Sequence, residues 1–137
     1  MRKKMRRSKM LAAVMFVVTI SGWLAGTKEV YAASITSTFY AGGEIVSTSL
    51  SGDMYGVMGS TSYTKGSGEV SVRLSGRARK SGTSILKDMT TALASANTPG
   101  GASQIMTPPA GYVLDAVNSH HYATINGESN YCESKLF

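Results

Sequence analysis

The sequence has 137 residues, among them 14 Lys and Arg and 8 Asp and Glu, which give a formal net charge of +6. The positive charge is concentrated at one end, because residues 1–32 contain seven of the basic residues and only one acidic residue, Glu29. The rest of the chain therefore has seven charges of each sign and a net charge of zero. This removes the main argument for a nucleic-acid partner, and the length suits one small domain.

Residues 1–32 have the three parts of a secretory signal peptide. A basic stretch over residues 2–9 is followed by an apolar stretch over residues 11–25 and by the small-residue site Val30-Tyr31-Ala32. The alternative is an uncleaved membrane anchor, but the apolar stretch is shorter than the ~20 residues that a spanning helix needs. We therefore expect cleavage after Ala32 and no membrane span afterwards. The long basic stretch is typical of Gram-positive bacteria, so the product is expected to be secreted, either free or associated with the cell wall.

Residues 33–137 are rich in Ser, Thr and Gly, a composition that favours strands joined by tight turns. Turn signals recur along the whole segment, as in an antiparallel sandwich or barrel. The sequence predicts a single all-β domain, a small antiparallel β-sandwich of Ig-like or related type with six to eight short strands. Weaker strand patterns cover residues 35–40, 44–50 and 103–107.

The clearest strand is predicted over residues 69–78, where apolar and polar side chains alternate with a period of two. The alternation turns the arginines outward and the aliphatic side chains inward. If residues 65–68 form a four-residue hairpin loop, Gly59 lies opposite Leu74. The same register gives an inner face that consists of Tyr55, Val57, Tyr63, Val70, Val72 and Leu74.

Residues 84–96 fit two kinds of secondary structure. Ile85, Met89 and Leu93 have helical spacing, whereas Thr90-Thr91 favours a strand. We favour the strand, and in either case expect these three apolar side chains in the core.

The last predicted element is a hairpin around Asn126-Gly127, a dipeptide that suits a two-residue type I′ turn. With this turn, Ile125 pairs with Glu128. The cross-strand pairs that follow are Tyr122 with Tyr131, His120 with Glu133, and His121 with Cys132. The tyrosines offer more apolar area, so we expect the tyrosine face to be the core and Cys132 to be at least partly accessible.

Cys132 is the only cysteine, so no intrachain disulfide can form. Three alternatives remain for its thiol: a buried small side chain, a disulfide-linked dimer, or a thiol activated by His121. Catalysis is disfavoured because neither an orienting third group nor an oxyanion hole is visible. Metal binding is disfavoured because His120 and His121 point to opposite faces of a strand. We expect no cofactor.

Five of the seven basic residues of residues 33–137 fall within fifteen positions: Arg73, Arg77, Arg79, Lys80 and Lys87. At strand spacing they predict a basic ridge that could hold an anionic polymer such as wall teichoic acid. The alternative is an outer face, or an edge strand, whose charge keeps the protein soluble.

Several short motifs carry a resemblance: Ser62-Tyr63-Thr64, the Gly-Ser-Gly turn at 66–68, Glu69-Val70-Ser71-Val72, the Pro-Pro-Ala-Gly-Tyr loop at 108–112 and Ser119-His120. In these features the chain resembles the small secreted all-β proteins of Gram-positive gut anaerobes. The resemblance implies the fold and the compartment, and no activity.

The sequence shows no converging acid, base and nucleophile. We therefore expect a non-catalytic binding module, secreted or surface-associated, whose partner is a cell-wall polymer or another protein. The alternatives are a secreted antagonist or host-acting effector and, less favoured, an enzyme built on Cys132.

Overall fold

The computed structural model describes residues 15–21 and 32–137. The strands in chain order are β1 Met15–Ser21, β2 Ala32–Ala41, β3 Glu44–Asp53, β4 Gly56–Lys80, β5 Leu86–Thr90, β6 Ala94–Met106, β7 Tyr112–Ile125 and β8 Glu128–Leu136. This part of the chain contains no helix, and so none that could cross a membrane. The all-β prediction is confirmed. The predicted signal peptide lies outside the described residues except for β1 and Ala32, the first residue of β2.

The strands form one antiparallel sheet in the order β1-β2-β3-β4-β7-β8, with β5 and β6 also paired to β4. Strand β4 has 25 residues, so it is not one of the short strands expected from the sequence. Residues 56–63, its first half, pair with β3 and β6, whereas residues 68–80, its second half, pair with β5, β6 and β7. Because β4 belongs to both parts of the sheet, its course determines how the sheet curls.

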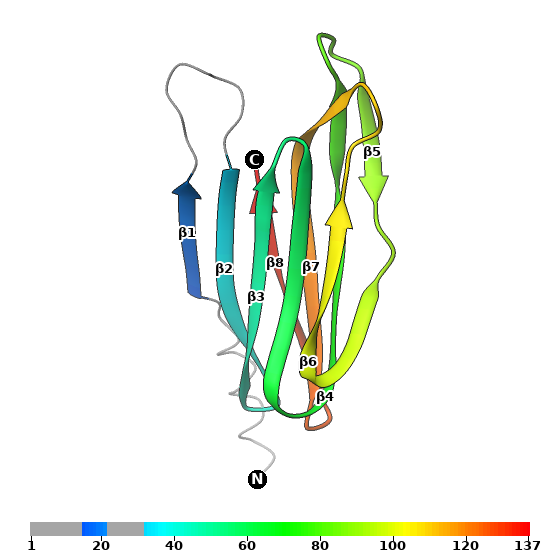
Figure 1. Ribbon diagram of the computed structural model, residues 1–137. Coiled ribbons are helices and arrows are strands. Elements are labelled where there is room, and N and C mark those ends of the chain that lie inside the picture. Colours follow the sequence, from blue (N-terminus) through cyan, green and yellow to red (C-terminus); the bar gives the residue numbers. More distant parts are fainter. Residues whose placement is uncertain (1–14, 22–31) are drawn as a thin grey trace.

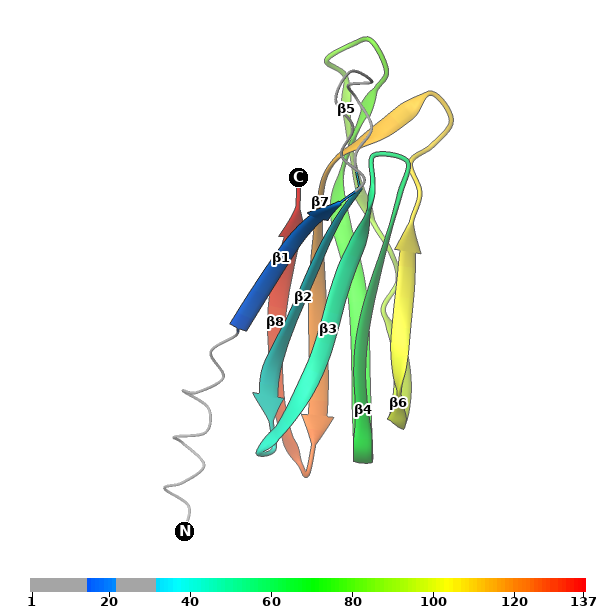
Figure 2. The same ribbon diagram turned by 60° about the vertical axis from the view of Figure 1, so that its left-hand side comes forward.

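The sheet curls where β4 and β6 bend together. The register between these strands shifts between Tyr63 and Gly68 of β4. The Thr98 hydroxyl of β6 donates a hydrogen bond of 2.6 Å to the carbonyl oxygen of Gly66 and so joins the two bends. As a result, β2, β3 and the first half of β4 lie across from β8, β7 and the second half of β4 (Figures 1 and 2).

The predicted hairpin loop at residues 65–68 is wrong. The two halves of β4 are not paired edge to edge, since each takes its backbone partners from other strands. They meet face to face, and a Cβ atom built on Gly59 would lie 2.8 Å from Leu74 Cδ2. The Thr61 hydroxyl also donates a hydrogen bond of 3.0 Å to the carbonyl oxygen of Ser71. The expected opposition of Gly59 and Leu74 is therefore present, but across the core.

The core lies inside the curled sheet and follows the predicted alternation along β4. The fully or nearly fully buried apolar side chains include Phe39, Val46, Leu50, Val57, Tyr63, Val70, Val72, Leu74, Val117, Ile125 and Leu136. Tyr55 was expected on this face and is exposed instead. It lies in the turn between β3 and β4, where its backbone N–H donates to Asp53 Oδ1.

The segment 84–96 contains strand β5 and the start of β6, so the strand prediction is confirmed. Met89 packs against the core as expected. Ile85 and Leu93 are exposed, which contradicts their predicted burial. Both lie in the connections that flank β5, where the alternation of a strand no longer applies.

Candidate functional site

The hairpin of β7 and β8 has the predicted turn and register. Asn126 and Gly127 both have positive φ angles, 51° and 77°, as a type I′ turn requires. Ile125 pairs with Glu128, and His121 lies opposite Cys132. On the other face the rings of Tyr122 and Tyr131 are 6.1 Å apart between centroids.

The assignment of the core face of this hairpin was wrong. His121 is fully buried and Cys132 is 6% exposed, whereas Tyr131 is 58% exposed. The expected accessible thiol is therefore absent, and a disulfide-linked dimer has no accessible sulfur in this structure. Burial raises the pKa of the Cys132 thiol, although hydrogen bonds with Ser37 and Thr48 act in the opposite direction. The thiol is protonated at neutral pH and is a poor nucleophile.

The polar partners of His121 explain why this face can be buried. Its Nδ1 atom lies 2.8 Å from Thr61 Oγ1, and its Nε2 atom lies 2.7 Å from Ser119 Oγ. Thr61 already donates its hydroxyl hydrogen to the carbonyl oxygen of Ser71, so Nδ1 must carry the proton and donate to Thr61. The Ser119 hydroxyl then donates to Nε2. Both ring nitrogens are satisfied in the neutral imidazole.

Burial lowers the pKa of His121 from 6.5 to about 4, and the neighbouring His120 acts in the same direction. A backbone hydrogen bond with Ser60 opposes the shift. His121 is therefore neutral at neutral pH, in agreement with the tautomer that its hydrogen bonds require.

The hydrogen-bonded chain from Ser119 through His121 to Thr61 has the arrangement of a nucleophile, a base and an orienting group. However, all three side chains are fully buried, so no substrate can reach the Ser119 hydroxyl. The cluster is structural. Sequence analysis missed Ser119 and Thr61, although the spacing of two between Ser119 and His121 places both on the same face of a strand.

The five residues of the predicted basic ridge do not share one face. In the pairing of β4 with β5, Arg77 lies opposite Asp88, whereas Lys87 lies opposite the buried Ala78. Lys80 follows Arg79 directly, so alternation places these two on opposite faces. The face with Lys80 and Lys87 is thus separate from the face with Arg73, Arg77 and Arg79.

The arginines are also partly neutralised. Arg77 Nε lies 3.4 Å from Asp88 Oδ1, and Arg79 Nε lies 3.2 Å from Asp115 Oδ1. Arg73 Nε is buried and has no hydrogen-bond partner. Beside it on β7, His120 Nδ1 lies 3.3 Å from Glu133 Oε2. The surface around these arginines therefore has mixed charge.

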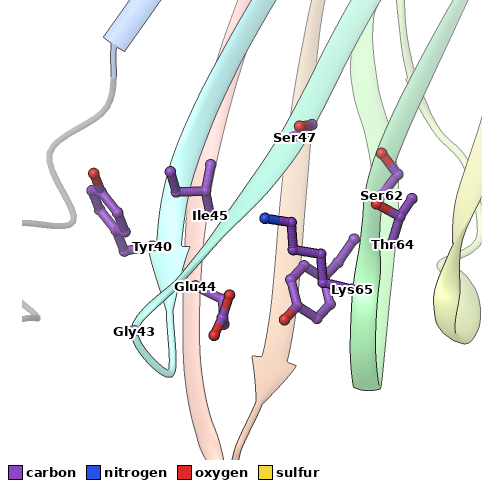
Figure 3. A pocket seen from close by; sticks show the side chains of 9 residues that line it. Tyr40, Gly43, Glu44, Ile45, Ser47, Ser62, Thr64 and Lys65 are labelled. Atoms are coloured by element: carbon purple, nitrogen blue, oxygen red, sulfur yellow. The ribbon is translucent and has the colours of Figure 1, made fainter.

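Two adjoining depressions hollow the outer face of β2, β3 and the first half of β4, with volumes of about 430 and 500 Å³. They share Ser47 and Ser62, and Figure 3 shows the first from close by. Together we call them the hydroxyl trough. Its outward hydroxyl side chains are Thr36, Thr38, Ser47, Ser49, Ser60, Ser62 and Thr64.

Six of these hydroxyl side chains form two rows across three neighbouring strands. The rows are Thr36, Ser49, Ser60 and Thr38, Ser47, Ser62. Adjacent strands are about 4.8 Å apart, so the hydroxyl groups are closely and regularly spaced. Ser49 and Ser60 already share a hydrogen bond of 2.7 Å. From the sequence alone these residues stood out only as part of a high Ser and Thr content. The two rows form only when β2, β3 and β4 are in register.

One end of the hydroxyl trough has different chemistry. Tyr40, Glu44, Ile45 and Lys65 line it, with Tyr40 and Ile45 exposed (Figure 3). Burial, followed by the charge of Glu44, raises the pKa of Tyr63. This end therefore combines one charge of each sign with apolar surface.

The arrangement offers hydroxyl donors and acceptors on a rigid sheet. The part of the chain that the structure describes contains no group of three or more His, Cys, Asp or Glu side chains placed to hold a metal ion. No protein-family model matches the sequence, and no curated protein or solved structure matches it.

Proposed function

We propose that the domain is a secreted, non-catalytic binding module of a Gram-positive bacterium that holds a cell-wall polymer in the hydroxyl trough. The observation that supports the proposal is the pair of hydroxyl rows across β2, β3 and β4, which lie in depressions open to solvent. In this proposal the curled sheet acts as a small β-sandwich that holds the trough rigid, and residues 1–32 direct export.

The chemistry of the trough favours an uncharged ligand with many hydroxyl or amide groups. Each Ser or Thr hydroxyl can donate one hydrogen bond and accept two, so the rows match both kinds of group. No charged residue lies in either row. Tyr40 and Ile45 at the end of the trough provide apolar surface for the carbon face of such a ligand. A wall glycan or its peptide stems have this chemistry, whereas the mixed charge around Arg77 and Arg79 is a weaker match to an anionic polymer.

Co-sedimentation with purified cell walls tests the proposal. The protein is exported from the full-length gene by a Gram-positive host and mixed with walls from that host. We expect the wild-type protein to sediment with the walls, and 1 M NaCl to release little of it, because screening acts mainly on charged contacts. Ser47→Arg should weaken retention at least about tenfold, equivalent to about 1.4 kcal/mol, because a large side chain fills the region that both depressions share.

Ser129→Arg is the matched control. Ser129 is exposed on the outer face of β8 and does not line the trough, so this variant should sediment like the wild type. Equal retention of both variants would remove the trough from the proposal. Wild-type protein that stays in the supernatant would contradict wall binding and favour an effector released to the medium.

A further inference from the structure

The side of β2 that faces away from β3 differs from the sheet edges at β5, β6 and β8. Ala32–Ala41 contains no charged residue, no proline and no glycine. The strands β5 and β8, each paired on one side only, contain two and three charged residues respectively, and β6 contains Pro99, Gly100 and Gly101. Charged residues, prolines and bends are the usual protection of a sheet edge. Strand β2 lacks this protection. Such a lack is expected where another strand covers the edge.

Within this chain β1 covers that edge. Residues Met15–Ser21 pair antiparallel with β2, from Met15 opposite Thr38 to Ser21 opposite Ala32. Strand β1 belongs to the segment that the proposed function assigns to export. If cleavage follows Ala32, the exported protein keeps β2 from Ala33 onward and loses the strand that covers it.

The hydrogen bond from Asn130 shows which backbone groups of β2 face this edge. Asn130 Nδ2 of β8 donates to the carbonyl oxygen of Tyr40 at 2.7 Å. Since the backbone groups of residues two apart point to the same side of a strand, those of Ser34, Thr36 and Thr38 face the edge too. In the exported protein, Asn130 still donates a hydrogen bond to the carbonyl oxygen of Tyr40. The backbone groups of Ser34, Thr36 and Thr38, however, lose their partners in β1.

We propose that a second copy of the exported chain covers this edge, by antiparallel pairing of β2 with β2 about a two-fold axis at Thr36. This register pairs Thr36 with its own copy and Ser34 with Thr38, so all three edge-facing residues find backbone partners. A pairing centred on Ile35 would place Thr38 opposite Ala32 of the other copy. Ala32 is absent after cleavage, so Thr38 would have no backbone partner. Two copies with zero net charge have no long-range repulsion to overcome.

The inference rests on the proposed function and extends it, because the dimer joins two hydroxyl troughs. Thr36 begins the row that continues through Ser49 and Ser60. In the dimer this row meets its copy at Thr36, so six hydroxyl side chains cross a continuous six-strand surface. A polymer ligand would then contact both protomers, which raises retention by avidity.

Analytical ultracentrifugation of the exported protein, without cell walls, tests the dimer. We expect the wild type to sediment as a dimer at micromolar concentration. Thr36→Lys and Thr36→Glu should each be monomeric, because like charges then face each other across the axis. An equimolar mixture of the two variants should restore the dimer, since the opposed charges attract. Thr124→Lys, on an exposed position of the central strand β7, should remain dimeric.

Circular dichroism spectra equal to that of the wild type confirm that the variants are folded. A monomeric wild type, dimeric single variants, or a mixture that stays monomeric would each overturn the inference. The two proposals can fail separately. Wall binding by a monomer would overturn the dimer alone, and a dimer that does not bind walls would overturn the binding function alone.

Discussion

His121 Nδ1 and Thr61 Oγ1, 60 positions apart in the sequence, lie 2.8 Å apart and join the two facing parts of the curled sheet. Thr61 belongs to the first half of β4, and His121 to β7. The hydrogen bond crosses a core that is otherwise mostly aliphatic, where an unpaired polar group is costly. The contact therefore makes the stability of the domain depend on the protonation of one side chain.

Acid should destabilise the protein through His121. Its pKa is about 4 in the folded protein and 6.5 in a free chain. Between these values the unfolded chain binds a proton that the folded chain does not, so the free energy of unfolding falls as the pH falls from 6.5 towards 4. The loss attributable to this group is about 3 kcal/mol, and it is absent above pH 6.5. Urea unfolding at pH 7.5, 5.5 and 4.5 measures it, and the pH dependence in this window should be much reduced in His121→Gln.

Thr61→Val should destabilise the protein while keeping the size of the side chain. The substitution leaves His121 Nδ1–H and the carbonyl oxygen of Ser71 without their partner. A buried group that loses its hydrogen bond costs about 1–3 kcal/mol, which the urea midpoint at pH 7.5 reports. Thr124→Val, at an exposed position, is the control and should change stability by less than about 0.5 kcal/mol. Equal stability of the two variants would show that the buried hydroxyl makes no contribution.

The Cys132 thiol should resist modification in the folded protein. It is buried and its pKa is raised, so the reactive thiolate is scarce and shielded. Maleimide labelling at pH 7 should be slow without denaturant and complete within minutes in 8 M urea. Fast labelling of the folded protein would contradict the burial of Cys132 and make the disulfide-linked dimer plausible again.

Two adjacent glycines allow a matched test of the turn between β2 and β3. Gly42 and Gly43 both have positive φ angles, 59° and 81°. A side chain on Gly42 would collide with the carbonyl oxygen of Ile125, whereas nothing lies near a side chain on Gly43. Both Gly→Ala variants should lose about 1–2 kcal/mol for the left-handed backbone, and Gly42→Ala should lose more because of the collision. Thermal unfolding of the two variants measures the difference.

The local features of the fold were predictable from the sequence, as the hairpin of β7 and β8 shows. Its turn type and register depend on Asn126-Gly127 and on residues within about ten positions of it. The alternation in β4 was also predictable, but alternation describes only which side chains point inward. Gly59 lies opposite Leu74 whether the two halves of β4 pair along their edges or face each other across the core, so the pattern could not distinguish the two arrangements.

The candidate sites depended on contacts between strands that no single strand's pattern shows. The two faces of the last hairpin differ little in apolar area, and what decides between them is that Thr61 and Ser119 satisfy His121. The hydroxyl trough requires β2, β3 and β4 in register, so its rows emerge only when the pairing of both consecutive hairpins is known. The five basic residues of the predicted ridge are divided by strand alternation, since Lys80 follows Arg79 directly and Lys87 pairs with the inward-facing Ala78 across the β4–β5 hairpin.

The length of β4 has a consequence for how the domain unfolds. This one strand supplies backbone partners to β3, β5, β6 and β7, and so to both parts of the curled sheet. Neither part can melt alone without leaving the other with a row of unpaired amides. The domain is therefore a single cooperative unit, and calorimetry should give one transition whose van't Hoff and calorimetric enthalpies agree.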